Sequence, residues 1–373
     1  MAQIVFVHGV ATRSSPALDL AEQSMADLLG RVVFQGVAHA ILAPRWGDHV
    51  PKIPREIYAT RQAAASFSLG IRDDEPAGIG VDEPSAAGSS LGALAADHPQ
   101  FAVDAVLTRL ADDAEAAHRR LTADELDLFA AAVDAQDDAD KARALTGRAG
   151  SDAALAFAIQ AEAESMSVLS AITDAVHGVT DRIRNAASTV AYGLLHDAVR
   201  PAVGLFGGDV FAYLNRGTLR GLIQQTVGDK LKAAWTAKSP DEPLIVIAHS
   251  MGGVIVTDML ADLTAAGLPA TLTVDFLLTV GSQPGLFQAV GALSGGVPSA
   301  GSRQPRPPCV RAWCNVFDPI DPLAFAAGPM FDGVEDLEFN SLTGLVSAHT
   351  TYFKRPQFYA RLRSRLADLS LLR

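Results

Sequence analysis

The feature that most limits how this chain can fold is a buried-strand pattern that runs directly into a serine-bearing turn and then into an apolar, helix-compatible segment. Its residues are Pro243-Leu-Ile-Val-Ile-Ala-His-Ser-Met-Gly-Gly-Val-Ile-Val-Thr257. A strand that enters a helix through so tight a turn holds the turn residue above the C-terminal edge of a sheet. Ala248, Gly252 and Gly253 are small enough for close packing, although Ala248 stands where such motifs usually have glycine. Ser250 is therefore the candidate nucleophile, and the alternative is a serine that only caps a helix.

A second apolar run, Gln3-Ile-Val-Phe-Val-His8, is followed by Gly9 and Val10. In acyl-transfer enzymes, the loop after such a strand donates one backbone N–H to the oxyanion, and the residue after the nucleophile donates another. The expected donors here are Val10 and Met251. The alternative is an ordinary N-terminal strand that ends at glycine.

With these two motifs the sequence resembles the α/β-hydrolase superfamily, and within it the lipase-like enzymes with Val-x-His-Gly and His-Ser-Met-Gly-Gly. The resemblance covers residues 1–50 and 216–373. It implies an α/β-hydrolase fold, in which a doubly wound, mostly parallel sheet carries a serine, an acid and a histidine in that order along the chain.

The sequence after Ser250 contains candidates for both the acid and the histidine. The predicted strand Cys309–Phe317 leads into Asp318-Pro-Ile-Asp321-Pro, and His349 follows a last short strand at Val334–Asn340. A neutral imidazole at His349 would take the serine proton, and a carboxylate would hold its tautomer and stabilise its charge. The family pattern assigns the acid to the later Asp-Pro, which favours Asp321. Asp318 stays open, because Asp321 is also a good helix cap and Asp318 a good turn residue.

The predicted core is interrupted by a long segment without a convincing strand. Residues 51–215 contain a low-complexity loop at 73–90, a capping box at Thr122 and Glu125, and an amphipathic helix. The apolar stripe of that helix is Leu169, Ile172, Val176, Val179 and Ile183. We expect one α/β-hydrolase domain over residues 1–373 with a helical cap or lid at 51–215. The alternative is a scaffold that packs beside the core without touching the site.

The other expected core elements are strands at His39–Arg45 and Thr273–Val280 and a helix at Arg216–Lys238. Trp46-Gly-Asp48 would line the pocket rim or only turn the chain, and packing is the expected role of His249. The single Glu115–His118 pair predicts a solvated helix face rather than a metal site. No phosphate loop, dinucleotide fingerprint or Cys/His metal spacing occurs, so no metal or cofactor is expected.

Composition limits the partners. The 373 residues are 49% hydrophobic and 19% charged, which suits a well-packed protein, and the net charge of −12 without a basic cluster argues against nucleic acid. Cys309 and Cys314 are too far apart on one strand to bond and are expected to be buried thiols. No signal peptide or membrane-spanning segment is apparent, so the expected location is cytoplasmic. Transient contact with a membrane surface stays open.

These observations predict a serine hydrolase that cleaves carboxylic esters through an acyl-enzyme, with a small-molecule or lipid ester as substrate. The preference for lipid or other apolar acyl esters comes from the resemblance. Two alternatives remain. An acyltransferase, thioesterase or amidase would use the same triad, and a non-catalytic protein with this fold would use the cap to hold a ligand.

Overall fold

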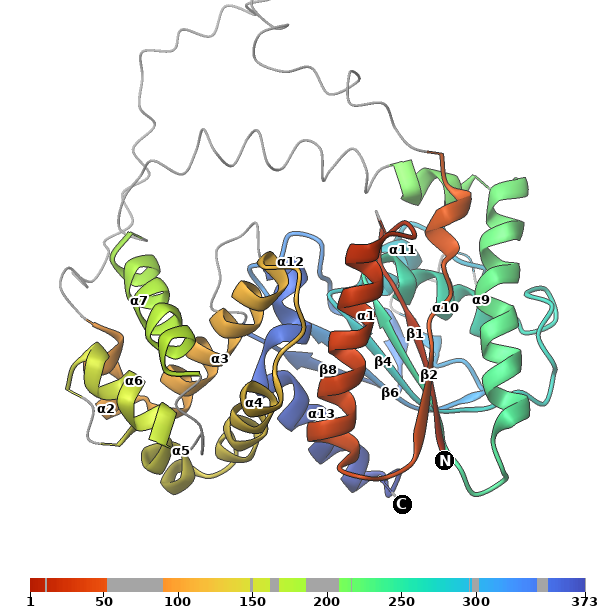
Figure 1. Cartoon of the computed structure of the whole chain (residues 1–373). Helices are drawn as coiled ribbons and strands as arrows, with labels where there is room; N and C mark the ends of the chain where they lie inside the picture. The colour runs from red at the N-terminus through yellow and green to blue at the C-terminus, as the bar shows by residue number, and fades with distance from the viewer. Residues whose placement is uncertain are drawn as a thin grey trace, which may run out of the picture.

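The computed structural model describes residues 1–10, 12–51, 90–147, 150–161, 168–185, 208–215, 217–294, 296, 302–340 and 348–372. Its centre is a six-stranded sheet in the order β2-β1-β3-β4-β6-β8, in which every neighbouring pair is parallel (Figure 1). The strands are β1 Ala2–Val7, β2 His39–Leu42, β3 Leu244–His249, β4 Val274–Val280, β6 Val310–Phe317 and β8 Val334–Glu338. The expected α/β class and parallel sheet are thus confirmed.

The register of the sheet brings the two sequence motifs together. Val7 of β1 pairs with Ala248 of β3, so His8 and His249 leave neighbouring strands at the same edge. Strand β2 ends at Leu42 rather than at the predicted Arg45. Pro44 cannot donate a ladder hydrogen bond, which favours an early end of the strand.

Helices cover both faces of the sheet, as a parallel sheet requires. Residues such as Ile4, Phe6, Ile245 and Ile247 face one core with helices α1 Pro16–Leu28 and α13 Pro356–Asp368 and the π-helical turn η1 Leu29–Phe34. The alternating positions face a second core with α9 Thr218–Ala237 and α10 Met251–Ala261. Helix α9 lies within the predicted range Arg216–Lys238, and its residues Ile223, Val227 and Leu231, spaced four apart, are buried.

The described part of the insertion is helical and contains no strand. Its helices are α2 Leu91–Asp97, α3 Pro99–Ala116, α4 Ala123–Ala135, α5 Ala139–Thr146, α6 Asp152–Ala161 and α7 Leu169–Asn185, and residues 208–214 are helical as well. The capping box of Thr122 and Glu125 starts α4 as predicted. Helices α3 and α4 pack on α13, whereas α7 packs on α3 and α6 (Figure 1). The predicted loop at 73–90 lies outside the described residues except for Ser90.

The described residues also form several short helices and strands. They are η2 Trp46–His49, α11 Pro284–Ala289, the paired strands β5 Gln304–Pro305 and β7 Phe331–Asp332, α12 Ala348–Thr351, and η5 Tyr352–Lys354. Within the described ranges, every helix is too short or too polar to cross a membrane.

Candidate active site

Ser250 lies between β3 and α10 in a backbone conformation that L residues rarely adopt. Its φ is 51° and its ψ is −128°, and the residue is fully buried. The N–H of Ser250 donates to Val280 O over 2.9 Å, and Ser282 Oγ donates to Ser250 O over 2.6 Å. A non-glycine residue held at positive φ costs of order 1–3 kcal/mol and persists only where its surroundings impose it. Such strain is typical of functional sites.

The glycines after the serine are required by close contacts. A Cβ at Gly252 would lie 2.3 Å from Val7 O, and a Cβ at Gly253 would lie 2.2 Å from Ser282 Oγ. Ala248 is fully buried in the second core, so its methyl group fits where the family usually has glycine. The motif therefore packs α10 directly against the ends of β1 and β4.

The structure brings Ser250, His349 and Asp321 into one hydrogen-bonded chain. His349 Nε2 is 2.9 Å from Ser250 Oγ, and His349 Nδ1 is 2.8 Å from Asp321 Oδ2. Because the carboxylate can only accept, Nδ1 carries the proton and Nε2 of neutral His349 is free to accept from the serine. The three residues come from the ends of β3 and β6 and from α12. This is the arrangement of a nucleophile, a base and an orienting acid.

The two candidate acids occupy different positions. Asp321 Oδ1 accepts the Leu323 N–H at 2.9 Å while its Oδ2 faces His349, so Asp321 both caps the following turn and meets the imidazole. Asp318 Oδ1 accepts the Ile320 N–H at 3.0 Å, as expected for a turn residue. The geometry therefore favours Asp321.

Tyr352 is a neighbour of the acid that the sequence motifs did not reveal. Its hydroxyl donates to Asp321 Oδ2 over 2.9 Å and accepts the Asp318 N–H at 3.0 Å. The side chain is fully buried, and burial together with the charge of Asp321 raises the pKa of Tyr352 far above its usual value. It is thus a fixed neutral donor. The available signal was its position three residues after His349, one helical turn away.

His249 contacts the backbone of the base. Its Nε2 donates to His349 O over 2.9 Å, and the two rings lie 4.8 Å apart. Burial, and next the charge of His349, lower the pKa of His249 to about 3, so the ring is neutral. His249 therefore packs as expected and also holds the backbone of His349.

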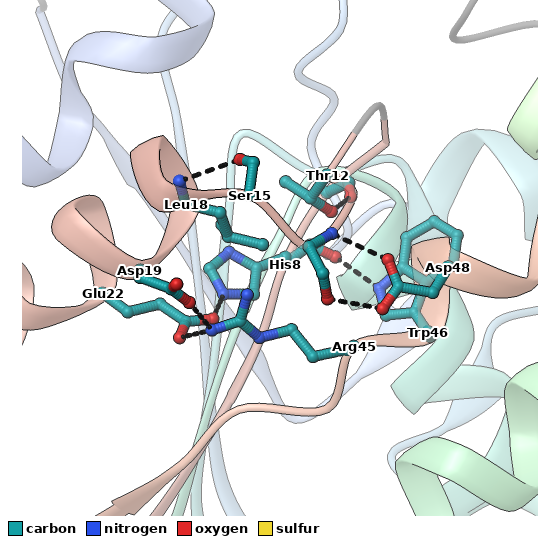
Figure 2. Close-up of polar contacts among 11 residues, drawn as sticks. His8, Thr12, Ser15, Leu18, Asp19, Glu22, Arg45, Trp46 and Asp48 are labelled. Carbon is teal, nitrogen blue, oxygen red and sulfur yellow. Dashed lines mark hydrogen bonds and ion pairs between the residues drawn. The ribbon is translucent and has the colours of Figure 1, made fainter. Parts of the chain in front are cut away.

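The expected oxyanion donors lie beside Ser250. Met251 is the first residue of α10, where an N–H has no partner within the helix. Val10 follows Gly9, and a Cβ at Gly9 would lie 2.7 Å from Ser250 Cβ. Side chains hold this loop, because Trp46 Nε1 donates to His8 O over 2.9 Å and Thr12 Oγ1 to Gly9 O over 2.7 Å (Figure 2).

Trp46 and Asp48 therefore act on the loop rather than on the pocket rim. Trp46 is fully buried in the second core. Asp48 accepts from both the N–H and the hydroxyl of Ser14, and these hydrogen bonds lower the pKa of the Asp48 carboxyl (Figure 2).

A pocket of about 300 Å³ opens onto Ser250 and His349. The core contributes apolar walls, among them Phe6, Leu18, Met25, Leu28 and Phe353. The insertion contributes Ala111 and Ala114 of α3 and the segment that includes Arg119 and Leu121. An apolar cavity of half this volume can hold benzene, so this pocket suits a modest apolar group.

The apolar stripe of α7 lies away from the pocket at Ser250. Ile172, Val176 and Val179 are buried in the first core, where α7 meets α3 and α6, and none of them lines this pocket. The sequence left open whether the insertion touches the site. Within the part of the insertion that the structure describes, α3 and the residues after it line the pocket. The side chain of Ile183 lies outside the described residues.

The remaining candidates have ordinary partners. Glu115 pairs with Lys354 at 2.6 Å, and the described residues contain no group of metal-ligating side chains. Both cysteines are free thiols; Cys314 is buried and Cys309 half-buried, and burial raises their pKa values to about 12 and about 11.

Comparison with protein-family models, curated proteins and solved structures finds no match for this chain. Its function must therefore be inferred from the geometry of the site.

Proposed function

We propose that the protein is a serine hydrolase of the α/β-hydrolase type that cleaves carboxylic esters with an apolar acyl group. The observation that carries the proposal is the chain Asp321–His349–Ser250, with hydrogen bonds of 2.8 and 2.9 Å, at a buried serine of positive φ. A serine that only capped α10 would need neither the imidazole nor the unusual backbone. The side chain of Ser250 also makes no cap hydrogen bond to α10.

The reaction follows from the roles of these groups. Ser250 Oγ attacks the ester carbonyl carbon as His349 Nε2 takes its proton, and Asp321 stabilises the imidazolium that forms. The N–H groups of Met251 and Val10 would bind the oxyanion. Collapse of the intermediate passes the proton from His349 to the leaving alcohol and leaves an acyl-enzyme. Water, deprotonated by His349, then attacks the acyl carbon, and as the bond to Ser250 Oγ breaks, the proton passes from His349 to Ser250 Oγ and the carboxylic acid is released.

The pocket supports an apolar acyl group. Its walls are mainly aliphatic and aromatic, and part of them belongs to the insertion. We propose that residues 51–215 form a cap whose helix α3 and following segment shield the acyl group from water. The cytoplasmic location expected from the sequence stays a prediction.

A fluorophosphonate probe with p-nitrophenyl esters of increasing chain length tests the proposal. The wild-type protein should be labelled at Ser250 and hydrolyse the esters, and Ser250→Ala should lose both properties by several orders of magnitude. The matched control is Ser239→Ala, an exposed serine in the turn before β3. Ester turnover by Ser250→Ala near the wild-type rate would show that the nucleophile is wrong, and absence of label and turnover in the wild type would favour the ligand-binding alternative. Product analysis with alcohol acceptors, thioesters and amides distinguishes the related acyl chemistries.

A further inference from the structure

A chain of charged side chains leads from the surface of α1 to the residue before the oxyanion loop. His8 Nε2 is 2.5 Å from Glu22 Oε1, the other oxygen of Glu22 binds Arg45, and Arg45 also binds Asp19 (Figure 2). His8 and Glu22 both line the pocket that contains Ser250. None of these contacts belongs to the triad.

This series of contacts ends at His8, directly before the loop that is expected to bind the oxyanion. His8 is only 8% exposed, and its carbonyl oxygen is already held by Trp46. The next residue, Gly9, lies so close to Ser250 that a Cβ on it would be 2.7 Å from Ser250 Cβ, and the N–H after it, that of Val10, is the expected oxyanion donor. A restraint on the His8 ring therefore acts two residues before the N–H that is this donor. Donors must lie within about 3 Å of the developing charge, so even a small displacement reduces their effect.

Stability alone does not explain a carboxylate at this position. Glu22 lies between Leu18 and Met25 on α1, and the pocket around it is mainly apolar. Removal of a carboxylate from water is costly, and an apolar side chain often replaces such a pair with no loss of stability. A carboxylate offers two acceptor oxygens instead, and here one accepts from His8 while the other is held by Arg45. This arrangement restrains the imidazole in a way that an apolar contact cannot.

We propose that Glu22 is a positioning residue for the oxyanion loop, which fixes the ring of His8 and through it the backbone of Gly9 and Val10. Arg45 holds Glu22 in turn and joins α1 to the segment that follows β2. This inference rests on the proposed function, since it concerns the same reaction.

The test compares Glu22→Ala, Glu22→Gln and Asp229→Ala in the whole chain. Glu22→Ala should lower kcat for a p-nitrophenyl ester by about 100-fold, comparable to the lower range for loss of an oxyanion donor, with KM changed by less than about threefold. It should slow fluorophosphonate labelling similarly, because the probe's phosphoryl oxygen occupies the same hole. Glu22→Gln keeps an acceptor for His8 and should recover at least about tenfold of the loss. Asp229→Ala removes an exposed carboxylate of α9, which pairs with Lys232 of the same helix and does not line the pocket, and should stay within about twofold of wild type.

Three outcomes would overturn the inference. A kcat for Glu22→Ala within threefold of wild type would show that the loop keeps its position without Glu22, while the proposed function would stand. Equal losses in Glu22→Ala and Glu22→Gln that follow a lowered melting temperature would assign Glu22 a structural role only. Failure of the wild type to label or to turn over ester would remove the proposed function and this inference together.

Discussion

Replacement of Asp321 by asparagine is the sharpest test of the triad, because three donors converge on this carboxylate. His349 Nδ1 and Tyr352 Oη meet Oδ2 at 2.8 and 2.9 Å, and the Leu323 N–H meets Oδ1 at 2.9 Å. Asparagine has one acceptor oxygen and one NH₂ group. Whichever way the amide is turned, its NH₂ group faces at least one of these donors.

The two orientations of the new amide have different consequences. With the NH₂ group toward Leu323, two donors oppose each other in a buried site, at a cost of about 1–3 kcal/mol in stability. With the NH₂ group toward His349, Nδ1 must become an acceptor and the proton moves to Nε2. The imidazole then cannot take the proton of Ser250.

The expected loss of activity has two parts. Two unit charges about 4 Å apart at an effective dielectric of about 20 attract by about 4 kcal/mol, which corresponds to about 10³ in rate. The wrong tautomer adds to this loss, so we expect kcat to fall by about 10⁴, as for other triad acids. Steady-state kinetics with p-nitrophenyl butyrate measures the loss, and a thermal melt checks the fold.

Asp318→Asn is the matched control, because it changes the same group in the same loop. Its Oδ1 accepts the Ile320 N–H, and the asparagine oxygen can do the same. We expect less than a tenfold loss in kcat. Equal losses in the two variants, or a larger loss in Asp318→Asn, would refute the assignment of Asp321 as the acid.

The remaining predictions concern the tyrosine beside the acid, the pocket wall and the buried histidine. Tyr352→Phe removes one donor to Asp321 and should lower kcat by about tenfold, measured against an unchanged KM; an unchanged kcat would show that His349 and the Leu323 N–H hold Asp321 in place without the tyrosine. Ala111→Phe adds a ring to the pocket wall and should reduce turnover of an octanoate ester at least tenfold more than turnover of an acetate ester. Ala117→Phe, at an exposed position just beyond the end of α3, should leave the ratio of octanoate to acetate turnover as in wild type. The same ratio in both variants would mean that α3 does not border the acyl site. Because the pKa of His249 falls from 6.5 to about 3 on folding, the unfolded chain binds the extra proton between these values. The free energy of unfolding should then fall by up to about 1.4 kcal/mol per pH unit as pH drops from 6.5 toward 3, and His249→Gln should flatten this slope in denaturant titrations; an unchanged slope would assign the acid sensitivity to other groups.

The core was predictable because its strands are nearly continuous apolar runs. Strand β3, which leads into Ser250, starts within one residue of its predicted position, and β1, β4 and β6 agree similarly well. In a parallel sheet, the residues that follow such strands gather at one edge. The meeting of Ser250, Asp321 and His349 could therefore be expected from the order of strands and loops along the chain.

Side-chain contacts between elements were not predictable in the same way. Tyr352 meets Asp321 across 31 residues and Arg45 meets Glu22 across 23, and no periodic pattern links either pair. The stripe of α7 correctly predicted an amphipathic helix, but an apolar stripe does not specify its partner. In the structure that partner is the rest of the insertion rather than the acyl pocket.

The contacts of the insertion show that α3 is tied to the histidine segment as well as to the pocket. Asp104 of α3 is buried against Arg355 and accepts the Gln357 N–H at 2.9 Å, and Asp112 binds Lys354 at 2.9 Å. Lys354 and Arg355 follow His349 by five and six residues in the chain. Breaking a buried pair by removal of one partner typically costs about 3–5 kcal/mol, so the junction between Asp104 and Arg355 resists separation. The part of the pocket wall formed by α3 and the segment that carries His349 are therefore joined, and a displacement of α3 from the core would disturb both.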